Sequence, residues 1–126
     1  MENGESSKRP HERLEVWRDS MELVEMIYKI SGNFPDSERF GLTSQIRRAA
    51  VSVPSNIAEG AARRSTPEYL RFLSIARGSL SEIATQIQIA VRLGYSKTSP
   101  RLDQYVDLIF AKLTALMNAL HKRGDA

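Results

Sequence analysis

Polar side chains that could do chemistry are concentrated between residues 45 and 82. The set combines amide, guanidinium, hydroxyl and carboxylate groups: Gln45, Arg48, Ser52, Asn56, Glu59, Ser79 and Glu82, with Arg47 beside them. Such groups can join helices through hydrogen bonds and fix their register, and guanidinium groups can also bind phosphate oxygens. We interpret the seven as a candidate structural polar network, in which Arg48 is expected to pair with Glu82 or Glu59.

The chain lacks the residues that enzymes commonly use for catalysis. There is no cysteine, and the two histidines, His11 and His121, lie near opposite ends of the sequence. A Ser-His-Asp triad, a cysteine nucleophile and a di-metal site built from Glu-x-x-His pairs are therefore unsupported. Neither a P-loop nor a GxGxxG run occurs. The sequence predicts no catalytic site, no metal and no cofactor, and hence a binding protein and not an enzyme.

Arginine is concentrated in the middle of a chain whose net charge is only +3. Residues 1–43 carry 6 basic and 9 acidic side chains, whereas residues 44–77 carry 6 arginines and only 2 carboxylates. Arg63 and Arg64 fall in a predicted link between helices, where they are hard to bury. We predict a basic surface that binds phosphate, with candidate contacts at Arg47, Arg63, Arg64, Arg71, Arg77 and Arg92.

Four segments have apolar residues at three- and four-residue steps, which is typical of amphipathic helices. The expected helices span residues 14–31, 40–60, 67–93 and 100–122. Ser-Thr-Pro-Glu at residues 65–68 and Ser-Pro at residues 99–100 supply an N-cap and a first-turn proline. Pro54 lies inside the second segment, where a proline costs about 3 kcal/mol. We therefore expect a kink or a break near residues 51–55.

Short links force neighbouring helices to run antiparallel, because a few residues cannot span a helix length of about 30–40 Å. The expected fold is an all-α, antiparallel up-down-up-down four-helix bundle of residues 13–123, preceded by a polar, disordered tail of residues 1–12. No stretch approaches the roughly 18 apolar residues of a membrane span. The lack of cysteine favours a cytoplasmic protein.

Aromatic and apolar residues on the helices are expected to serve packing. Trp17, Tyr69 and Phe72 lie at helical spacing among aliphatic residues, so we interpret them as core and not as base-stacking platforms. The third helix has apolar residues around most of its circumference, at Leu70, Phe72, Leu73, Ile75 and Ala76. One bundle needs less apolar surface than this, and the excess predicts contacts between subunits.

The run QIRRAAVSVPSNIAEG at residues 45–60 resembles the four-helix bundle proteins encoded in 23S rRNA intervening sequences. Pro54 stands where many members of that family have another residue. The similarity covers about residues 14–120 and extends to Gly41-Leu42, Arg64, Tyr69, Phe72-Leu73, the run from Ile75 to Leu80, Glu82 and Gly94-Tyr95. It implies a four-helix bundle that assembles into a homopentamer, a ring or barrel of bundles with a central channel.

A relative that is similar in fold to this family is the accessory variability protein of diversity-generating retroelements. The resemblance implies that such a protein forms a pentamer and works with a reverse transcriptase and nucleic acid. Five copies of this chain would multiply its charge of +3 to about +15, which is enough to attract a polyanion that one subunit would hold weakly.

The leading hypothesis is a non-enzymatic homo-oligomer that binds RNA or DNA through its arginines, led by Arg63 and Arg64. The alternative is a protein-interaction scaffold, for example an accessory subunit that binds a reverse transcriptase or another partner protein. The two hypotheses predict different salt dependence. Affinity that rests on phosphate contacts falls steeply as salt rises, whereas an apolar protein interface responds little.

Overall fold

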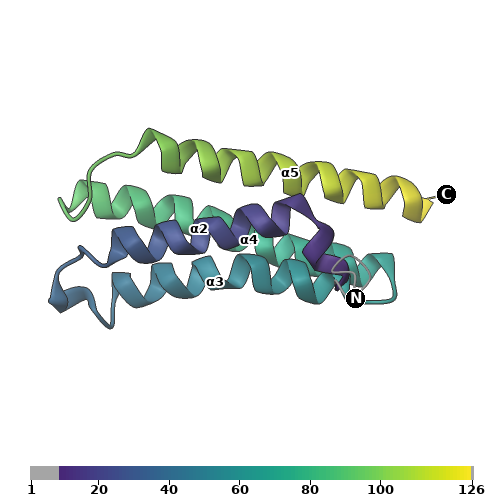
Figure 1. Cartoon of the computed structure of the whole chain (residues 1–126), viewed down its shortest axis with the longest axis horizontal. Coiled ribbons are helices and arrows are strands. Elements are labelled where there is room, and N and C mark those ends of the chain that lie inside the picture. The colour runs from purple at the N-terminus through teal and green to yellow at the C-terminus, as the bar shows by residue number, and fades with distance from the viewer. Residues whose placement is uncertain (1–8, 126) are drawn as a thin grey trace, which may run out of the picture.

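Four long helices form the body of the protein. The computed structural model describes residues 9–125, which contain no strand (Figure 1). The elements in chain order are the 3-10 helix η1 (Pro10–Arg13), α2 (Glu15–Ser31), the 3-10 helix η2 (Asp36–Glu38), α3 (Leu42–Ala61), α4 (Thr66–Arg92) and α5 (Pro100–Asp125). These bounds agree with the four predicted helices to within a few residues at each end.

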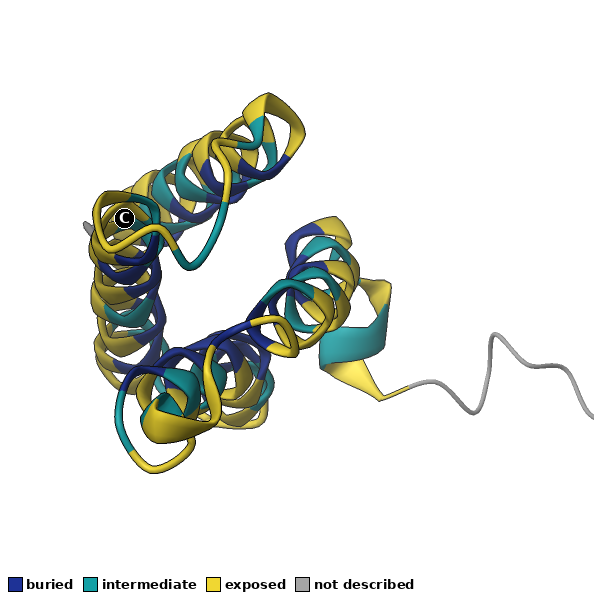
Figure 2. Ribbon diagram, turned by 90° about the vertical axis from the view of Figure 1, so that its left-hand side faces the viewer, coloured by how far each residue is buried: buried dark blue, intermediate teal, exposed yellow. Residues whose placement is uncertain are grey.

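Each long helix runs opposite to the one before it (Figure 1). Within the described residues, α3 packs between α2 and α4, and α5 contacts both α4 and α2. Seen end-on in Figure 2, the buried stripes of the helices face inward. The predicted antiparallel up-down-up-down bundle is confirmed. None of its described helices combines the length and the apolar character that crossing a membrane requires.

Local sequence explains where the helices begin and end. The Ser65 hydroxyl accepts the backbone N–H of Glu68 at 3.3 Å, which caps the start of α4 as predicted. The Ser99 hydroxyl accepts the backbone N–H of Leu102 in the same way at the start of α5. After α4 the chain turns at Gly94, whose φ of 77° is the left-handed conformation that glycine adopts without strain.

The core is aliphatic and is drawn from all four long helices. Its fully buried side chains are Leu23, Ile27, Ile46, Val53, Ile57, Leu73, Leu80, Ile83, Leu102, Ile109 and Leu113. Trp17 and Tyr69 pack against this core, as predicted. Phe72 is also buried, but two arginines, Arg63 and Arg71, lie over its ring at 4.7 and 5.0 Å from the centroid. Trp17 and Tyr69 are thus half-buried against the core, and the Phe72 ring is in contact with two arginines.

Pro54 does not break the second predicted helix, because α3 continues through it. Proline removes one backbone hydrogen bond and crowds the preceding turn. The neighbouring Val53 and Ile57 are completely buried, and Pro54 itself is buried with them. Tertiary burial on both sides therefore outweighs the local cost.

The predicted tail of residues 1–12 is too long at its C-terminal end. Residues 10–13 form η1, which contacts α2 and α3. The His11 ring meets Trp17 edge-on with 4.9 Å between centroids, and Glu12 accepts the backbone N–H of Arg9 at 2.9 Å. Polar and ring contacts thus attach a segment that lacks aliphatic residues. Residues 1–8 lie outside the described part of the chain.

A cluster of opposite charges joins α2 to α5. The Lys112 ammonium donates to the carboxylates of both Glu15 and Asp19. The hydrogen bond and positive charge of Lys112 lower the pKa of Glu15, and the hydrogen bonds that Lys112 donates to Asp19 and Glu15 raise the pKa of Lys112. This cluster fixes the first helix of the bundle against the last, so it closes the ring of four helices.

The helices α3 and α4 approach closely at Gly60. A Cβ at this position would lie 3.0 Å from both the Phe72 Cβ and the Tyr69 Cδ1, and 3.2 Å from the Tyr69 carbonyl oxygen. Gly78 on α4 is exposed, and a Cβ there would meet no atom within 4 Å. Close packing therefore disfavours a larger residue at Gly60, whereas Gly78 has room for one.

We predict that Gly60→Ala lowers the free energy of unfolding by about 1–3 kcal/mol, because the added methyl pushes α3 away from Tyr69 and Phe72 on α4. Gly78→Ala should raise it by about 0.5–1 kcal/mol, because alanine has the better helix propensity. Urea denaturation followed by circular dichroism measures both. A Gly60→Ala variant as stable as the wild type would contradict the close approach.

Candidate functional site

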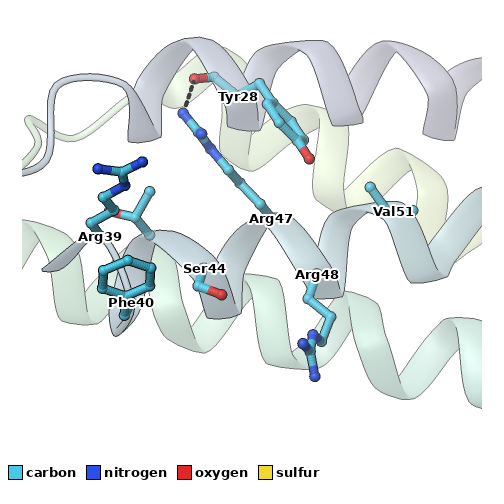
Figure 3. A pocket seen from close by; sticks show the side chains of 8 residues that line it. Tyr28, Arg39, Phe40, Ser44, Arg47, Arg48 and Val51 are labelled. Carbon is cyan, nitrogen blue, oxygen red and sulfur yellow. Dashed lines mark hydrogen bonds between the residues drawn. The ribbon is translucent and has the colours of Figure 1, made fainter.

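A surface pocket of about 530 Å³ opens between the C-terminal half of α2 and the start of α3 (Figure 3). We call it the arginine pocket. Its lining residues are Tyr28, Arg39, Phe40, Thr43, Ser44, Arg47, Arg48 and Val51. Three guanidinium groups and no carboxylate line it, so its charge favours an anion. A pocket with this composition can bind phosphate or carboxylate groups.

Arg47 is held in place by the end of α2. Its Nε donates to the Ser31 hydroxyl at 2.8 Å, and its Nη2 donates to the Tyr28 carbonyl oxygen at 3.2 Å. The guanidinium carbon also lies 4.6 Å from the centroid of the Tyr28 ring. A cation at a helix C-terminus is stabilised by the helix dipole. The Tyr28 carbonyl oxygen that Arg47 contacts also accepts the backbone N–H of Gly32 at 3.1 Å. Arg47 therefore supports the fold while adding charge to the pocket.

Arg39 and Arg48 are the exposed cations of the pocket. Arg48 makes no ion pair within residues 9–125, so its expected pair with Glu82 or Glu59 does not form. Figure 3 shows its side chain directed away from Arg47. The Arg39 guanidinium carbon lies 5.4 Å from the centroid of the Phe40 ring. Both guanidinium groups are open to a ligand.

Phe40 is 89% exposed, which is the largest exposure among the large hydrophobic residues of the described chain. The sequence pattern placed it at the start of the apolar stripe of the second helix. The structure corrects this assignment, because the helix begins at Leu42 and Gly41 is its N-cap. Phe40 therefore stands on a turn at the rim of the pocket, with Arg39 beside it.

Glu38 fixes the turn that carries Arg39 and Phe40. One carboxylate oxygen accepts the backbone N–H of Leu42 at 3.0 Å, and the other accepts the Tyr95 hydroxyl at 3.0 Å. The hydrogen bond to Glu38 raises the pKa of Tyr95. A Cβ on Gly41 would lie 2.6 Å from the first of these oxygens, so a larger residue there would displace the carboxylate from this position.

Three members of the predicted polar network join α3 to α4. The hydroxyls of Ser52 and Ser79 share a hydrogen bond at 2.8 Å, and the Asn56 amide donates to the Ser52 hydroxyl at 2.9 Å. Asn56 also donates to the Ser52 carbonyl oxygen at 2.8 Å. A small hydroxyl cluster therefore fixes the register of the two helices next to Pro54.

The other predicted network members do not reach across this interface. Gln45 is exposed and makes no side-chain hydrogen bond within the described residues. Glu82 accepts from Gln86 on its own helix at 3.4 Å, and Glu59 binds Arg63. Their side chains lie on outer faces of helices whose inner faces are filled by aliphatic residues.

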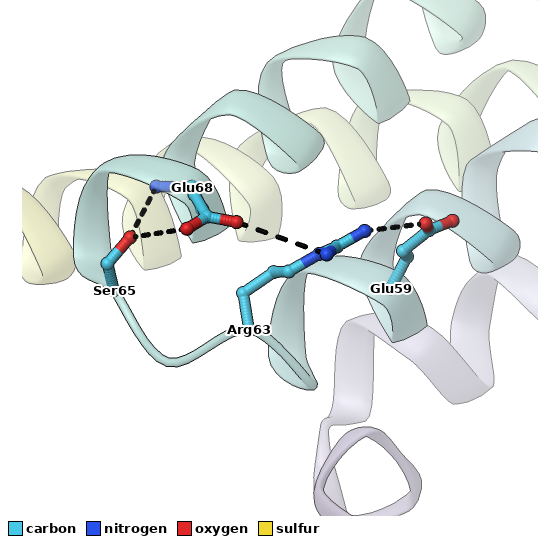
Figure 4. A network of polar contacts seen from close by, with 4 residues as sticks. All are labelled: Glu59, Arg63, Ser65 and Glu68. Atoms are coloured by element: carbon cyan, nitrogen blue, oxygen red, sulfur yellow. Dashed lines mark hydrogen bonds and ion pairs between the residues drawn. The ribbon is translucent and has the colours of Figure 1, made fainter.

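The six arginines predicted to bind phosphate are not brought together. Arg63, expected to lead, is paired with Glu59 at 2.9 Å and with Glu68 at 4.0 Å (Figure 4). It also lies over the Phe72 ring. Arg71 lies over the same ring. Arg64, Arg77 and Arg92 are exposed and make no ion pair within residues 9–125. Only Arg47 of the six lies in the arginine pocket.

Sequence reasoning missed Arg39, Phe40 and Glu38. The sequence Glu-Arg-Phe-Gly-Leu at residues 38–42 contained a signal that Phe40 lies outside the helix, because a glycine separates it from the first helical residue. No group of three or more His, Cys, Asp or Glu side chains able to hold a metal ion occurs among the described residues.

A comparison with protein families finds one match. The family described as 23S rRNA-intervening sequence protein matches residues 12–115. No curated protein matches the sequence. The matched range contains the whole arginine pocket, the Glu38 turn and the hydroxyl cluster between α3 and α4.

We predict that Arg47→Ala lowers the free energy of unfolding by about 1–2 kcal/mol, because it removes two charge-assisted hydrogen bonds and a cation–π contact. Arg48→Ala should change it by no more than about 0.5 kcal/mol. The two variants lose the same charge from neighbouring positions, which makes them a matched pair in chemical denaturation. Equal losses would contradict the different roles assigned to the two residues.

Proposed function

This chain belongs to the 23S rRNA-intervening sequence protein family, and we propose that it is a non-enzymatic protein that binds RNA or DNA. The arginine pocket is the main contact surface in this proposal. Arg39 and Arg48 bind phosphate oxygens directly, while Arg47 contributes charge from its fixed position. The more distant Arg64, Arg77 and Arg92 add attraction over the rest of the surface.

The observation that carries the proposal is the composition of the pocket. Its lining contains three guanidinium groups, hydroxyl groups from Thr43 and Ser44, and no carboxylate. The nearby Glu38 carboxylate is occupied by Leu42 and Tyr95, so it competes little for the arginines. Arginine forks match the spacing of phosphate oxygens, and binding them releases the counterions of the nucleic acid.

We further propose that the chain acts as a homo-oligomer, with a homopentamer as the expected form, in the cytoplasm. Large apolar side chains remain exposed on α4, at its C-cap and on α5: Ile75, Ile89, Leu93 and Leu108 are each 40–55% accessible in the single chain. Burying such residues against a second copy is favourable by about 25 cal/mol per Å² of apolar surface. Several copies would present several arginine pockets to one polyanion, which raises the apparent affinity.

The same exposed apolar side chains support a second candidate function, a protein-interaction scaffold. In that case the chain would be an accessory subunit that binds a reverse transcriptase or another partner protein. Its interface would be apolar, and its affinity would respond little to salt. Nucleic-acid binding by the purified chain would then be weak.

Salt-dependent binding tests the proposal. The logarithm of the association constant for labelled RNA should fall linearly with the logarithm of salt concentration, by about 0.7–0.9 per neutralised phosphate. Arg39→Ala/Arg48→Ala should reduce the magnitude of this slope by about 1–2. Fluorescence anisotropy across a salt series measures both quantities.

The control is Arg64→Ala/Arg77→Ala, which removes the same charge from other exposed positions. It should weaken binding less than the pocket variant. No binding at low salt would contradict the proposal and favour the scaffold. A larger loss in the control than in the pocket variant would move the contact surface to the region of Arg64 and Arg77.

A further inference from the structure

We infer that the arginine pocket binds an unpaired nucleotide, with the Phe40 ring stacked on the base and the Arg39 and Arg48 guanidinium groups on the flanking phosphates. This inference rests on the proposed nucleic-acid binding and adds the class of ligand, a single strand in preference to a duplex. It is carried by the position, rigidity and surroundings of Phe40.

The surroundings of Phe40 match the two parts of a nucleotide. The ring is 89% exposed and lies at the rim of a pocket whose charged groups are all positive. A flat apolar surface next to guanidinium groups is complementary to a base next to phosphate. An isolated exposed hydrophobic residue would need no explanation, but this one is combined with three cations in one pocket.

The turn that presents Phe40 is fixed before any ligand binds. Glu38 ties residues 38–42 to the start of α3 through Leu42, and to the link between α4 and α5 through Tyr95. The Tyr95 ring in turn lies 5.9 Å from the Phe34 ring, centroid to centroid. Because the platform is already ordered, binding loses little conformational entropy at this turn.

A single strand uses this arrangement better than a duplex does. Bases in a duplex are stacked on their neighbours, and their faces are not available to a side chain outside the helix. In single strands, base–aromatic stacking adds substantially to affinity for each base and tolerates any sequence. Arg39 lies at one side of the Phe40 ring, and guanidinium groups also stack on exposed bases.

Charge argues against a second copy of this chain as the occupant. The chain has a net charge of +3, and the pocket has three arginines and no lining carboxylate. A second copy would have to bring an acidic face to the pocket to avoid repulsion. A nucleic acid instead supplies negative phosphates for the arginines and a flat base for the Phe40 ring.

The test compares Phe40→Leu with Phe40→Tyr on the full chain. Leucine keeps an apolar side chain but removes the ring, whereas tyrosine keeps a ring that can stack. The probes are a short, fluorescein-labelled single-stranded RNA and a labelled RNA duplex of the same length, titrated at one low salt concentration.

We expect Phe40→Leu to weaken binding of the single strand by about 5- to 150-fold and to change duplex binding by less than about twofold. Phe40→Tyr should stay within about threefold of the wild type on both probes. Because Phe40 is exposed, both variants should give the circular dichroism spectrum of the wild type.

Three outcomes would overturn the inference. If Phe40→Leu binds the single strand as the wild type does while Arg39→Ala/Arg48→Ala is weakened, the nucleic-acid proposal stands and the stacking fails. If the wild type binds neither probe, the proposed function fails and the inference fails with it. If Phe40→Leu lowers the molar mass in light scattering, Phe40 lies between copies of the chain.

Discussion

Glu38 accepts two hydrogen bonds that organise one end of the bundle, from the backbone of Leu42 and from the hydroxyl of Tyr95. The first satisfies an open N–H group at the start of α3, and the second ties that start to the link after α4. A Cβ on Gly41 would lie 2.6 Å from the same carboxylate and would displace it. Phe40 lies on this turn directly before the N-cap Gly41, and its ring is 89% exposed.

The arginines divide into those that support the fold and those that face solvent. Arg47 closes the end of α2, and Arg63 is shared between two carboxylates and an aromatic ring. Their charges still contribute to the electrostatic field of the protein, but their guanidinium groups are already bound within the fold. Arg39 and Arg48 lie within one pocket without such ties to carboxylates. An arginine bound by a helix end or by carboxylates therefore supports the fold, whereas an exposed arginine without those contacts can bind a ligand.

Much of the fold could be predicted from the sequence, because helix periodicity and caps such as Ser65 act locally. Continuity through Pro54 could not, since it depends on the burial of residues from other helices. The site was less predictable. The sequence places Arg63 in an exposed link between helices, but only the structure shows that it pairs with Glu59 and Glu68. Phe40 fits an apolar stripe by spacing, and only the Glu38 cap excludes it from the helix.

The central claim is that nucleic acid contacts the arginine pocket and not Arg64 or Arg77. Phenylglyoxal modification of arginines in the wild-type protein, with and without a short single-stranded RNA and read by mass spectrometry, tests this directly. The claim predicts that RNA protects Arg39 and Arg48 while Arg64 and Arg77 react at unchanged rates. Protection of Arg64 and Arg77 with Arg39 and Arg48 unaffected, or protection of no arginine at all, would contradict it.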